Sequence, residues 1–397
     1  MSPHRRGFLN LLLAIPVVGP VFSWLAPGLR AQEKRRDVYA ELGLRPLLNA
    51  AGTYTALGGS LMRPEVVEAM ASAARQYVNL LELQAAVGQK IAGLIGCESA
   101  LVTAGAASAL TLGTAACVAG KDPDKIRRLP DTAGMKNEVI IQKAHRYGYD
   151  HAVRNAGIKM LEVETKPELE KAVNDRTAMM LFFNDAEPLG QIKVEEFASL
   201  GKKLGVPTFN DAAADVPPVE HLTRYLRMGY DLVCFSGGKG LRGPQSAGLL
   251  LGRKELLEAA ALNNNPHTDT IGRTNKVDKE DLVGMWAAVD AYLKQDHKEM
   301  WQDWEKRVQT IAALVGKLPG VKTERYVPPI ANHVPHLKVT WDVARLTPAD
   351  VVKKLREGQP RIEIRALLKD GIEVSVWMLQ PGEADVVGRR LREVLGG

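Results

Sequence analysis

The chain has 397 residues, of which 46% are hydrophobic and 25% are charged, and its net charge is +6. These proportions are typical of a soluble globular protein, and they exclude a disordered chain, a collagen-like chain and a polytopic membrane protein. The three cysteines, Cys97, Cys117 and Cys234, form no CxxC pair, which excludes a disulfide framework and a cysteine-built zinc site, so we expect free thiols.

The N-terminal residues 1–31 predict an export signal. Arg5 and Arg6 precede residues 11–26, which carry no charge, include prolines and are short for a membrane span of ~20 residues. The paired arginines resemble the bacterial twin-arginine signal, whose export machinery carries folded proteins to the periplasm. Cleavage after Ala31 is one option. The alternatives are an uncleaved anchor and an ordinary N-terminal helix.

Loss of that signal would also remove half of the net positive charge. Without Arg5, Arg6 and Arg30 the Lys+Arg count falls from 52 to 49 against 46 acidic residues, which leaves +3. So small an excess of positive charge, spread over the remaining chain, does not predict a basic surface that would bind DNA or RNA. We therefore expect no nucleic-acid partner.

From about residue 95, apolar runs of strand length alternate with helical patterns. The predicted strands lie at 138–142, 159–163, 177–183, 206–210, 231–235 and 247–251. This alternation predicts an α/β fold with a mostly parallel sheet covered on both faces. Ligands bind such sheets outside the carboxyl ends of the strands, so we expect the functional residues just after strands.

The pattern changes near residue 279, where a long helical stretch begins. Beyond residue 320, strands at 336–341, 361–367 and 371–377 accompany helices at 348–357 and from 383 to the end, which predicts a small α+β domain. The predicted division is a signal at 1–31, an N-terminal segment at 32–60, a large domain at 61–278, a linking helical region at 279–320 and a small C-terminal domain at 321–397.

Two charged residues follow predicted strands of the large domain. Lys239 lies in Ser236-Gly-Gly-Lys after the strand 231–235, and a partly desolvated lysine there suits Schiff-base chemistry. Asp211 ends the strand 206–210 and is followed by alanines, so its carboxylate could pair with a protonated ring nitrogen of a flat cofactor. A surface lysine and a helix-capping or metal-binding aspartate are the alternatives.

Two further segments follow strands. Gly105, Ala106, Ala107 and Ser108 open an apolar helix, whose free N–H groups could hold an anion, although close helix packing would explain the small residues equally well. His145 follows the strand 138–142 and could stack on a cofactor ring. A lone histidine is more often structural.

Taken in order, the motifs Thr-Ala-Gly-Ala-Ala-Ser, Asn-Asp-Ala-Ala-Ala and Ser-Gly-Gly-Lys-Gly-Leu-Arg-Gly-Pro-Gln resemble those of fold-type I pyridoxal-phosphate enzymes. Within these, the chain is most similar to the bacterial selenocysteine synthase-like group, which includes D-glucosaminate-6-phosphate ammonia-lyase. Asn49-Ala-Ala-Gly and Ile271-Gly-Arg-Thr also match. The resemblance covers residue 37 to the end and implies an aspartate aminotransferase-like large domain of seven-stranded type and a homodimer or larger homo-oligomer.

The resemblance also assigns roles to the strand-end residues. Lys239 would form the Schiff base with pyridoxal 5'-phosphate, and Asp211 would pair with the pyridine nitrogen. Residues 105–108 and Ser236 would hold the phosphate, and His145 would stack on the ring.

An α-carboxylate on an amino-acid substrate calls for an arginine, because a guanidinium is forked and always charged. Arg365 on a strand of the small domain is the first candidate, with Arg361 on the same face. Arg63 is the second. Arg242 could bind substrate or reach a subunit interface, and a structural salt bridge is its alternative.

Subgroup resemblance predicts a lyase that eliminates the β-hydroxyl of a polar hydroxy-amino acid and yields a 2-keto acid and ammonia. An aminotransferase or an amino-acid racemase on the same fold is the alternative. A non-enzymatic alternative is a cofactor-bound periplasmic binding or scaffold protein. Selenium transfer to tRNA is disfavoured, because an exported enzyme would not meet charged tRNA.

Overall fold

A computed structural model describes residues 36–397. By their internal contacts, residues 36–46 and the residues from Leu47 onward belong to two separate units. In the first, Asp37 caps the short helix α1 (Val38–Glu41) by accepting a hydrogen bond from the Ala40 N–H. The predicted export signal, residues 1–31, lies outside the described residues. Within residues 36–397, no helix combines the length and apolar character that crossing a membrane requires.

The central feature of the second unit is a seven-stranded sheet with the strand order β2-β8-β7-β6-β5-β3-β4. Its strands are β2 (Ser99–Thr103), β3 (Glu138–Gln142), β4 (Lys159–Val163), β5 (Thr177–Phe183), β6 (Thr208–Asp211), β7 (Leu232–Ser236) and β8 (Gly248–Gly252). Neighbouring strands run parallel except β8, which is antiparallel to both β2 and β7. The predicted α/β fold with a mostly parallel sheet is confirmed.

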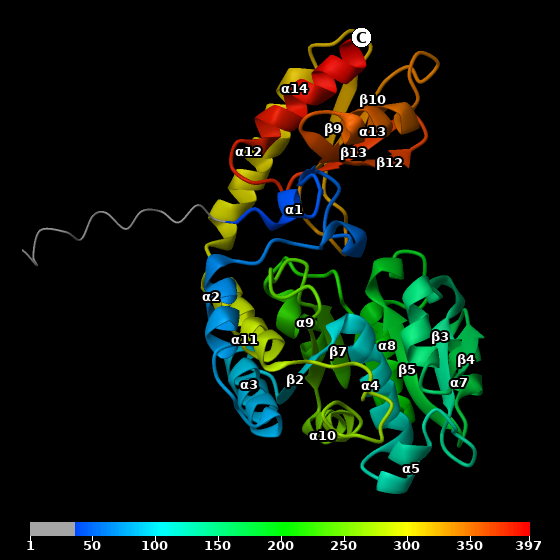
Figure 1. Cartoon of the computed structure of the whole chain (residues 1–397). Helices are drawn as coiled ribbons and strands as arrows, with labels where there is room; N and C mark the ends of the chain where they lie inside the picture. The colour runs from blue at the N-terminus through cyan, green and yellow to red at the C-terminus, as the bar shows by residue number, and fades with distance from the viewer. Residues whose placement is uncertain (1–35) are drawn as a thin grey trace, which may run out of the picture. The chain divides into compact units, whose positions relative to one another are not determined.

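Both faces of this sheet are buried because alternate strand residues enter two different hydrophobic clusters. Met180 and Phe182 on β5 join one cluster, whereas Met179 and Leu181 join the other. Helices cover each face, with α3, α8, α9 and α11 on the first and α4, α5, α6 and α10 on the second (Figure 1). This explains why the strands appear in the sequence as continuous apolar runs instead of alternating ones.

The long helical stretch predicted from residue 279 is two helices in the structure, whereas the predicted helix at 348–357 is present with the same bounds. The α-helices after α1 are α2 (Pro64–Ala73), α3 (Leu80–Ile95), α4 (Gly105–Ala119), α5 (Pro123–Arg128), α6 (His151–Arg154), α7 (Lys166–Ala172), α8 (Val194–Leu204), α9 (His221–Met228), α10 (Lys254–Leu262), α11 (Lys279–Lys294), α12 (His297–Val315), α13 (Pro348–Glu357) and α14 (Glu383–Gly396). Short 3-10 turns are η1 (Thr55–Leu57), η2 (Lys143–His145), η3 (Gly148–Asp150) and η4 (Asn184–Ala186).

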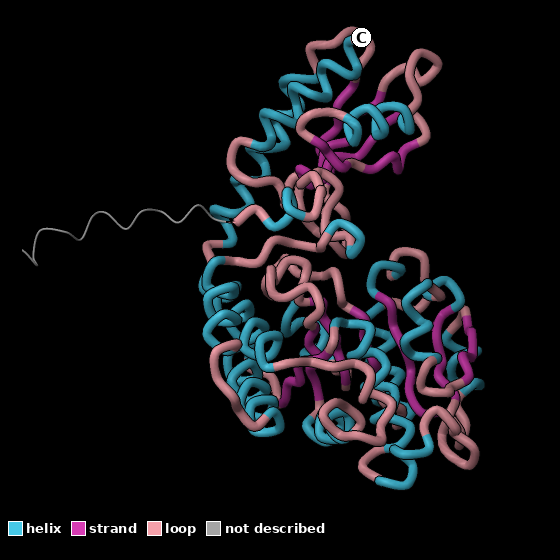
Figure 2. The backbone as a smooth tube through the Cα atoms, in the orientation of Figure 1, coloured by secondary structure: helices cyan, strands magenta, loops and turns pink. Residues whose placement is uncertain are grey.

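A second, antiparallel sheet follows α12 and has the strand order β12-β13-β10-β9. Its strands are β9 (Lys322–Tyr326), β10 (His336–Thr340), β12 (Arg365–Leu368) and β13 (Gly371–Ser375). One face is apolar and packs with α12, α13 and α14 in a third hydrophobic cluster. The tube in Figure 2 shows these helices and strands together. The opposite face is polar.

The predicted strand at 361–367 is two strands in the structure. β11 (Arg361–Glu363) pairs in parallel with β1 (Leu47–Asn49), and β12 then joins the four-stranded sheet. Buried Ile364 lies between them and belongs to the third cluster. The seven-stranded sheet falls within residues 61–278 and the four-stranded sheet within 321–397, while the exact division into domains stays a prediction.

Candidate active site

A cavity of about 660 Å³ opens at the carboxyl ends of the central strands, in the unit from Leu47 to Gly397. The strand register brings Phe183 and Asp211, the last residues of β5 and β6, side by side, with Cys234 of β7 next to Asp211. The N-terminus of α4 and the polar face of the four-stranded sheet also line the cavity. The cavity therefore lies at the sheet edge where the strand-end rule predicts ligand binding.

Lys239 lines the cavity from the turn after β7. Burial lowers the pKa of its ammonium, while the nearby carboxylates of Asp211, Asp215 and Asp185 act in the opposite direction. The glycines beside it permit close packing: a Cβ at Gly240 would come within 2.1 Å of the Val216 carbonyl oxygen. The lysine is therefore held on a tightly packed turn in a partly desolvated, acidic environment.

Asp211 is buried at the end of β6 and lines the same cavity. Its Oδ1 accepts a hydrogen bond from the Ala213 N–H at 3.1 Å, and its Oδ2 accepts one from the Tyr147 hydroxyl at 2.5 Å. Burial and the Asp211 carboxylate raise the pKa of Tyr147 well above its ordinary value. The phenol therefore stays protonated and donates to the carboxylate.

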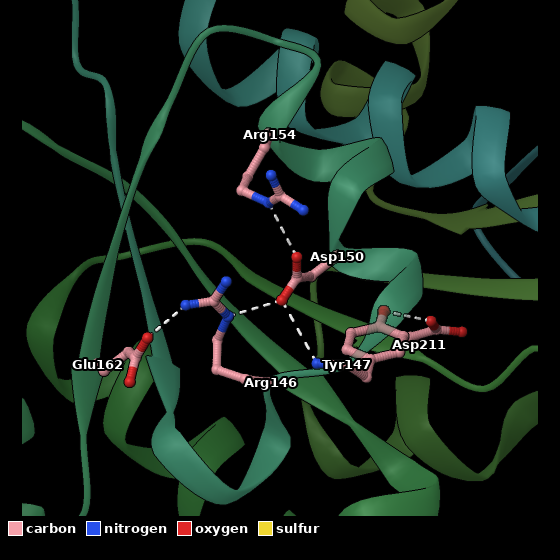
Figure 3. A network of polar contacts seen from close by, with 6 residues as sticks. All are labelled: Arg146, Tyr147, Asp150, Arg154, Glu162 and Asp211. Atoms are coloured by element: carbon pink, nitrogen blue, oxygen red, sulfur yellow. Dashed lines mark hydrogen bonds and ion pairs between the residues drawn. The ribbon is translucent and has the colours of Figure 1, made fainter.

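The segment that carries Tyr147 is held by the buried Asp150 (Figure 3). Its carboxylate accepts hydrogen bonds from Arg146 Nε at 2.6 Å, Arg154 Nε at 2.9 Å and the Tyr147 N–H at 3.3 Å. Burial alone would raise the pKa of Asp150, but these hydrogen bonds outweigh it and hold the pKa below its usual value. Asp150 thus stays ionised and fixes the backbone from which Tyr147 reaches Asp211.

The start of α4 offers open backbone donors to the cavity. Gly105, Ala106 and Ala107 line it, and the N-cap residue, Ala104, has no side chain able to satisfy the first N–H groups. The buried Ser108 Oγ has no hydrogen-bond partner, and such an orphaned donor needs a ligand or water to offset its burial. An anionic group such as a phosphate fits this position.

Ser236 also lines the cavity, as predicted for a phosphate contact. Together with the α4 N-terminus, Asp211 and Lys239, it places an anion cradle, a carboxylate and an amine around one cavity. These residues fit pyridoxal 5'-phosphate, whose phosphate, ring nitrogen and aldehyde carbon would need those three partners. Their roles stay predictions.

His145 requires a correction, because its ring does not line the cavity. The side chain is 0% exposed, and it lies edge-on to Phe182, with ring centroids 4.4 Å apart. Its Nδ1 accepts a hydrogen bond from the Phe183 N–H at 3.3 Å. Burial lowers the pKa of His145 to about 4, so the imidazole is a neutral structural group packed beside the sheet.

At the strand ends, an aromatic residue that does line the cavity is Phe183, the last residue of β5. Its ring stacks on that of Tyr147, with centroids 3.8 Å apart and an angle of 8° between the planes. The sequence reasoning missed both residues. The strand-end rule could have found Phe183, but the two-residue offset between His145 and Tyr147 gave no sign of which ring turns inward.

Of the predicted arginines, only Arg365 lines the cavity, and its guanidinium lies 4.1 Å from the centre of the Tyr54 ring. Burial lowers its pKa. Arg63 donates to Gln295, Arg242 Nε donates to the Leu61 carbonyl oxygen at 2.9 Å, and Arg361 pairs with Glu363. In this structure these three are held in other contacts, which corrects the expectation that Arg63 or Arg242 lies at the substrate.

Two acidic residues of the cavity were not predicted. Asp185 follows β5 directly, and burial raises its pKa. Asp215 accepts hydrogen bonds at Oδ2 from Asn184 Nδ2 at 2.8 Å and from the Tyr225 hydroxyl at 2.5 Å, and burial raises its pKa to about 6. Both follow strands, so the strand-end rule could have found them.

This arrangement of a lysine, a carboxylate and an open helix N-terminus at the strand ends of a seven-stranded sheet defines a fold-type I pyridoxal-phosphate enzyme. Comparison with known proteins agrees. The chain matches the SelA family (L-seryl-tRNA selenium transferase) over residues 47–326, and it belongs to that family. The predicted fold and pyridoxal 5'-phosphate cofactor are confirmed.

Individual relatives cover nearly the whole chain. A 5'-C-glycyluridine monooxygenase-decarboxylase from Streptomyces sp is 31% identical over 90% of this chain and 92% of the relative. A D-glucosaminate-6-phosphate ammonia lyase from Salmonella typhimurium is 28% identical over 90% of this chain and 98% of the relative. A solved structure of D-glucosaminate-6-phosphate ammonia-lyase superposes with a TM-score of 0.78 at 26% identity, covering 91% of this chain and 98% of the other.

Proposed function

We propose that the protein is a lyase that converts a polar 3-hydroxy-2-amino acid into a 2-keto acid and ammonia. The observation that carries this proposal is the single cavity in which Lys239, Asp211, the α4 N-terminus and Arg365 meet. The similarity to an ammonia lyase over most of both chains supports the reaction type.

Each residue has a task in this reaction. Pyridoxal 5'-phosphate, when bound, supplies an electron sink for negative charge developing at the substrate α-carbon. The Asp211 carboxylate would keep the ring nitrogen protonated, and Tyr147 holds that carboxylate in place. The open N–H groups of α4, with Ser236 and Ser108, would bind the phosphate.

Lys239 and Arg365 act on the substrate side. Arg365 is placed to bind the α-carboxylate by a charge-assisted pair. The Lys239 amine, with its pKa lowered by burial, would accept the α-proton, and the β-hydroxyl would leave as water after protonation. A water molecule then displaces ammonia. Because one water leaves and one is consumed, the net change is the conversion of the hydroxy-amino acid into its keto acid and ammonia.

The test is to incubate the cofactor-loaded protein with 3-hydroxy amino acids and to measure ammonia and keto acid together. Equal amounts of both support the lyase. Ammonia-free conversion that depends on a keto-acid acceptor would indicate an aminotransferase instead, and loss of optical rotation alone would indicate a racemase. Absence of any turnover would favour the binding or scaffold alternative.

We further propose that the protein is exported folded to the periplasm by the twin-arginine route. Support comes from Arg5-Arg6 and the uncharged residues 11–26. A reporter fused to residues 1–31 should reach the periplasm, and replacement of both arginines, Arg5→Lys with Arg6→Lys, should keep it in the cytoplasm. Periplasmic delivery of the replaced version would contradict the proposal.

A homodimer or larger homo-oligomer is also proposed. Exposed apolar side chains gather between residues 61 and 81, where such a patch suits contact with a second copy. They are Leu61, Met62, Val67, Tyr77, Val78 and Leu81. Sedimentation at the mass of a single chain would contradict this proposal.

A further inference from the structure

The wall of the cavity formed by the four-stranded sheet differs from an ordinary solvent-facing sheet surface. On β10 and β13, Leu337, Val339, Ile372 and Val374 enter the third hydrophobic cluster. Because side chains alternate along a strand, the polar residues between them share the other face. The members of that face that line the cavity are Tyr326, His336, Arg365, Glu373 and Ser375, here called the sheet-face subsite.

Two of these polar side chains, Ser375 and His336, are almost fully buried, and the protein satisfies His336 only at Nδ1 and Ser375 not at all. Ser375 is 1% exposed, and its Oγ has no hydrogen-bond partner. His336 is 4% exposed, and its Nδ1 donates to the Val334 carbonyl oxygen at 2.8 Å, which leaves Nε2 as an acceptor. Buried polar groups without partners are costly, so a bound molecule is the natural partner.

The remaining members of the subsite provide a mixed set of donors and acceptors. The Tyr326 hydroxyl donates to Glu373, and that carboxylate can still accept further hydrogen bonds. Ser375 offers a hydroxyl that can donate or accept, and His336 Nε2 accepts. Since a hydroxyl group both donates and accepts, a chain of substrate hydroxyls satisfies such a mixture better than an apolar side chain.

The charges of the cavity oppose a second anionic group on the substrate. Among the described residues that line it, the side-chain cations are Lys239 and Arg365, whereas the carboxylates are Asp185, Asp211, Asp215 and Glu373. Arg365 lies directly across from Glu373 in the strand register. Among these lining residues, Arg365 therefore supplies the guanidinium that a substrate carboxylate can bind, and Lys239 takes part in the proposed reaction.

Lys338, the next cation on this sheet face, is already engaged. Its Nζ pairs with Glu324 at 3.0 Å and lies 4.3 Å from the centre of the Tyr326 ring. With Arg365 occupied by the substrate carboxylate, a phosphate on the far end of the substrate would meet the Glu373 carboxylate without a further cation of this subsite to offset it.

We infer that the substrate is a polyhydroxylated amino acid without a phosphate, whose hydroxyl chain binds the sheet-face subsite while its carboxylate binds Arg365. The inference rests on the proposed function for the end of the cavity near Lys239. It assigns the opposite end of the substrate, where Ser375 and Glu373 distinguish a hydroxyl from a phosphate ester.

The experiment uses the cofactor-loaded full chain and three probes: D-glucosaminate, its 6-phosphate ester and serine. Ammonia release gives kcat/KM, and the change in visible absorbance of the bound cofactor gives binding. We expect kcat/KM for D-glucosaminate to exceed that for each of the other two probes by about tenfold or more. A factor of this size is typical of gaining or losing one charge-assisted contact. Preference for the phosphate ester, for serine, or no binding of D-glucosaminate would overturn the inference.

The two proposals fail in different ways. Saturable binding that favours D-glucosaminate without ammonia release would refute the lyase and keep the subsite. Ammonia release from all three probes with equal efficiency would keep the lyase and refute the subsite.

Variants test the residues themselves. Ser375→Ala should raise KM for D-glucosaminate by about 3- to 10-fold and leave KM for serine unchanged. Glu373→Gln should reduce the ratio of kcat/KM for D-glucosaminate to kcat/KM for its phosphate ester, because it removes the carboxylate that repels the phosphate. Thr340→Ala is the control, because Thr340 shares the polar face but does not line the cavity. Cofactor absorbance and circular dichroism establish folding, and equal KM changes for both substrates would contradict the assignment.

Discussion

The two ends of the cavity are built by different kinds of backbone. At one end, the parallel strands β5, β6 and β7 lie side by side and present Phe183, Asp211 and, after β7, the turn that carries Lys239. At the other end, an antiparallel sheet turns its polar face inward. The first end follows a rule of α/β sheets and holds the cofactor chemistry. The second end follows no such rule, and it is where we propose that the substrate is distinguished.

The largest effect is expected at the first end. Lys239→Ala should reduce ammonia release by about 10³-fold or more, because it removes both the covalent anchor and the proton acceptor. Assays of ammonia, with circular dichroism to establish folding, check this. Lys203→Ala is the control, since Lys203 forms only an exposed pair with Glu170. Retention of activity without Lys239 would refute the chemical assignment.

Asp211→Asn should lower kcat by about 10²-fold, since a neutral amide no longer favours a protonated ring nitrogen. Tyr147→Phe should act in the same direction but more weakly, by about 3- to 10-fold, because it removes one hydrogen bond to the carboxylate and leaves its charge. The visible spectrum of the bound cofactor should shift in both variants. A Tyr147→Phe effect as large as that of Asp211→Asn would show that the hydrogen bond, and not the charge, is decisive.

At the second end, Arg365→Gln should lower kcat/KM by about 10- to 100-fold, mostly through KM, because a charge-assisted contact to the substrate carboxylate is lost. Substrate titrations measure this. Arg325→Gln is the control. It changes an exposed arginine of the same sheet that pairs with Glu305, and it should leave kcat and KM unchanged. An effect confined to kcat would indicate that Arg365 does not hold the ground-state substrate.

The smallest effect concerns stability. Because burial raises the pKa of Asp215 to about 6, above its unfolded value near 4, the folded protein holds this proton more tightly than the unfolded chain does. The contribution of Asp215 to stability is therefore greatest below pH 4 and declines as the pH rises towards 6. Thermal unfolding of the wild type and of Asp215→Asn from pH 4 to 7 measures the difference, which should fall across this window. A constant difference would contradict the raised pKa.

The sequence predicted the first end well for physical reasons. Parallel buried strands appear as apolar runs, their ends converge, and Lys239 and Asp211 are charged residues placed directly after two of them. The prediction for His145 failed, because this residue, at the end of the turn η2 after β3, packs into the core, and Tyr147, two positions later, reaches the Asp211 carboxylate.

In the sequence, the second end of the cavity appears only as an alternation of polar and apolar residues along the C-terminal strands. Nothing in that pattern distinguishes a face exposed to water from one that lines a cavity, so Glu373, Ser375 and His336 went unnoticed. Arg365 could be predicted because a substrate carboxylate calls for a guanidinium. The arginines Arg63 and Arg242 met the same chemical criterion and failed on contacts that depend on the tertiary fold.

The most direct test of the central claim is covalent. The purified protein is loaded with pyridoxal 5'-phosphate, reduced with borohydride and digested, and the labelled peptide is identified by mass spectrometry. The account predicts loss of visible absorbance and a phosphopyridoxyl group on Lys239 alone, with no label in Lys239→Ala. A label on another lysine, or none on the wild type, would contradict it.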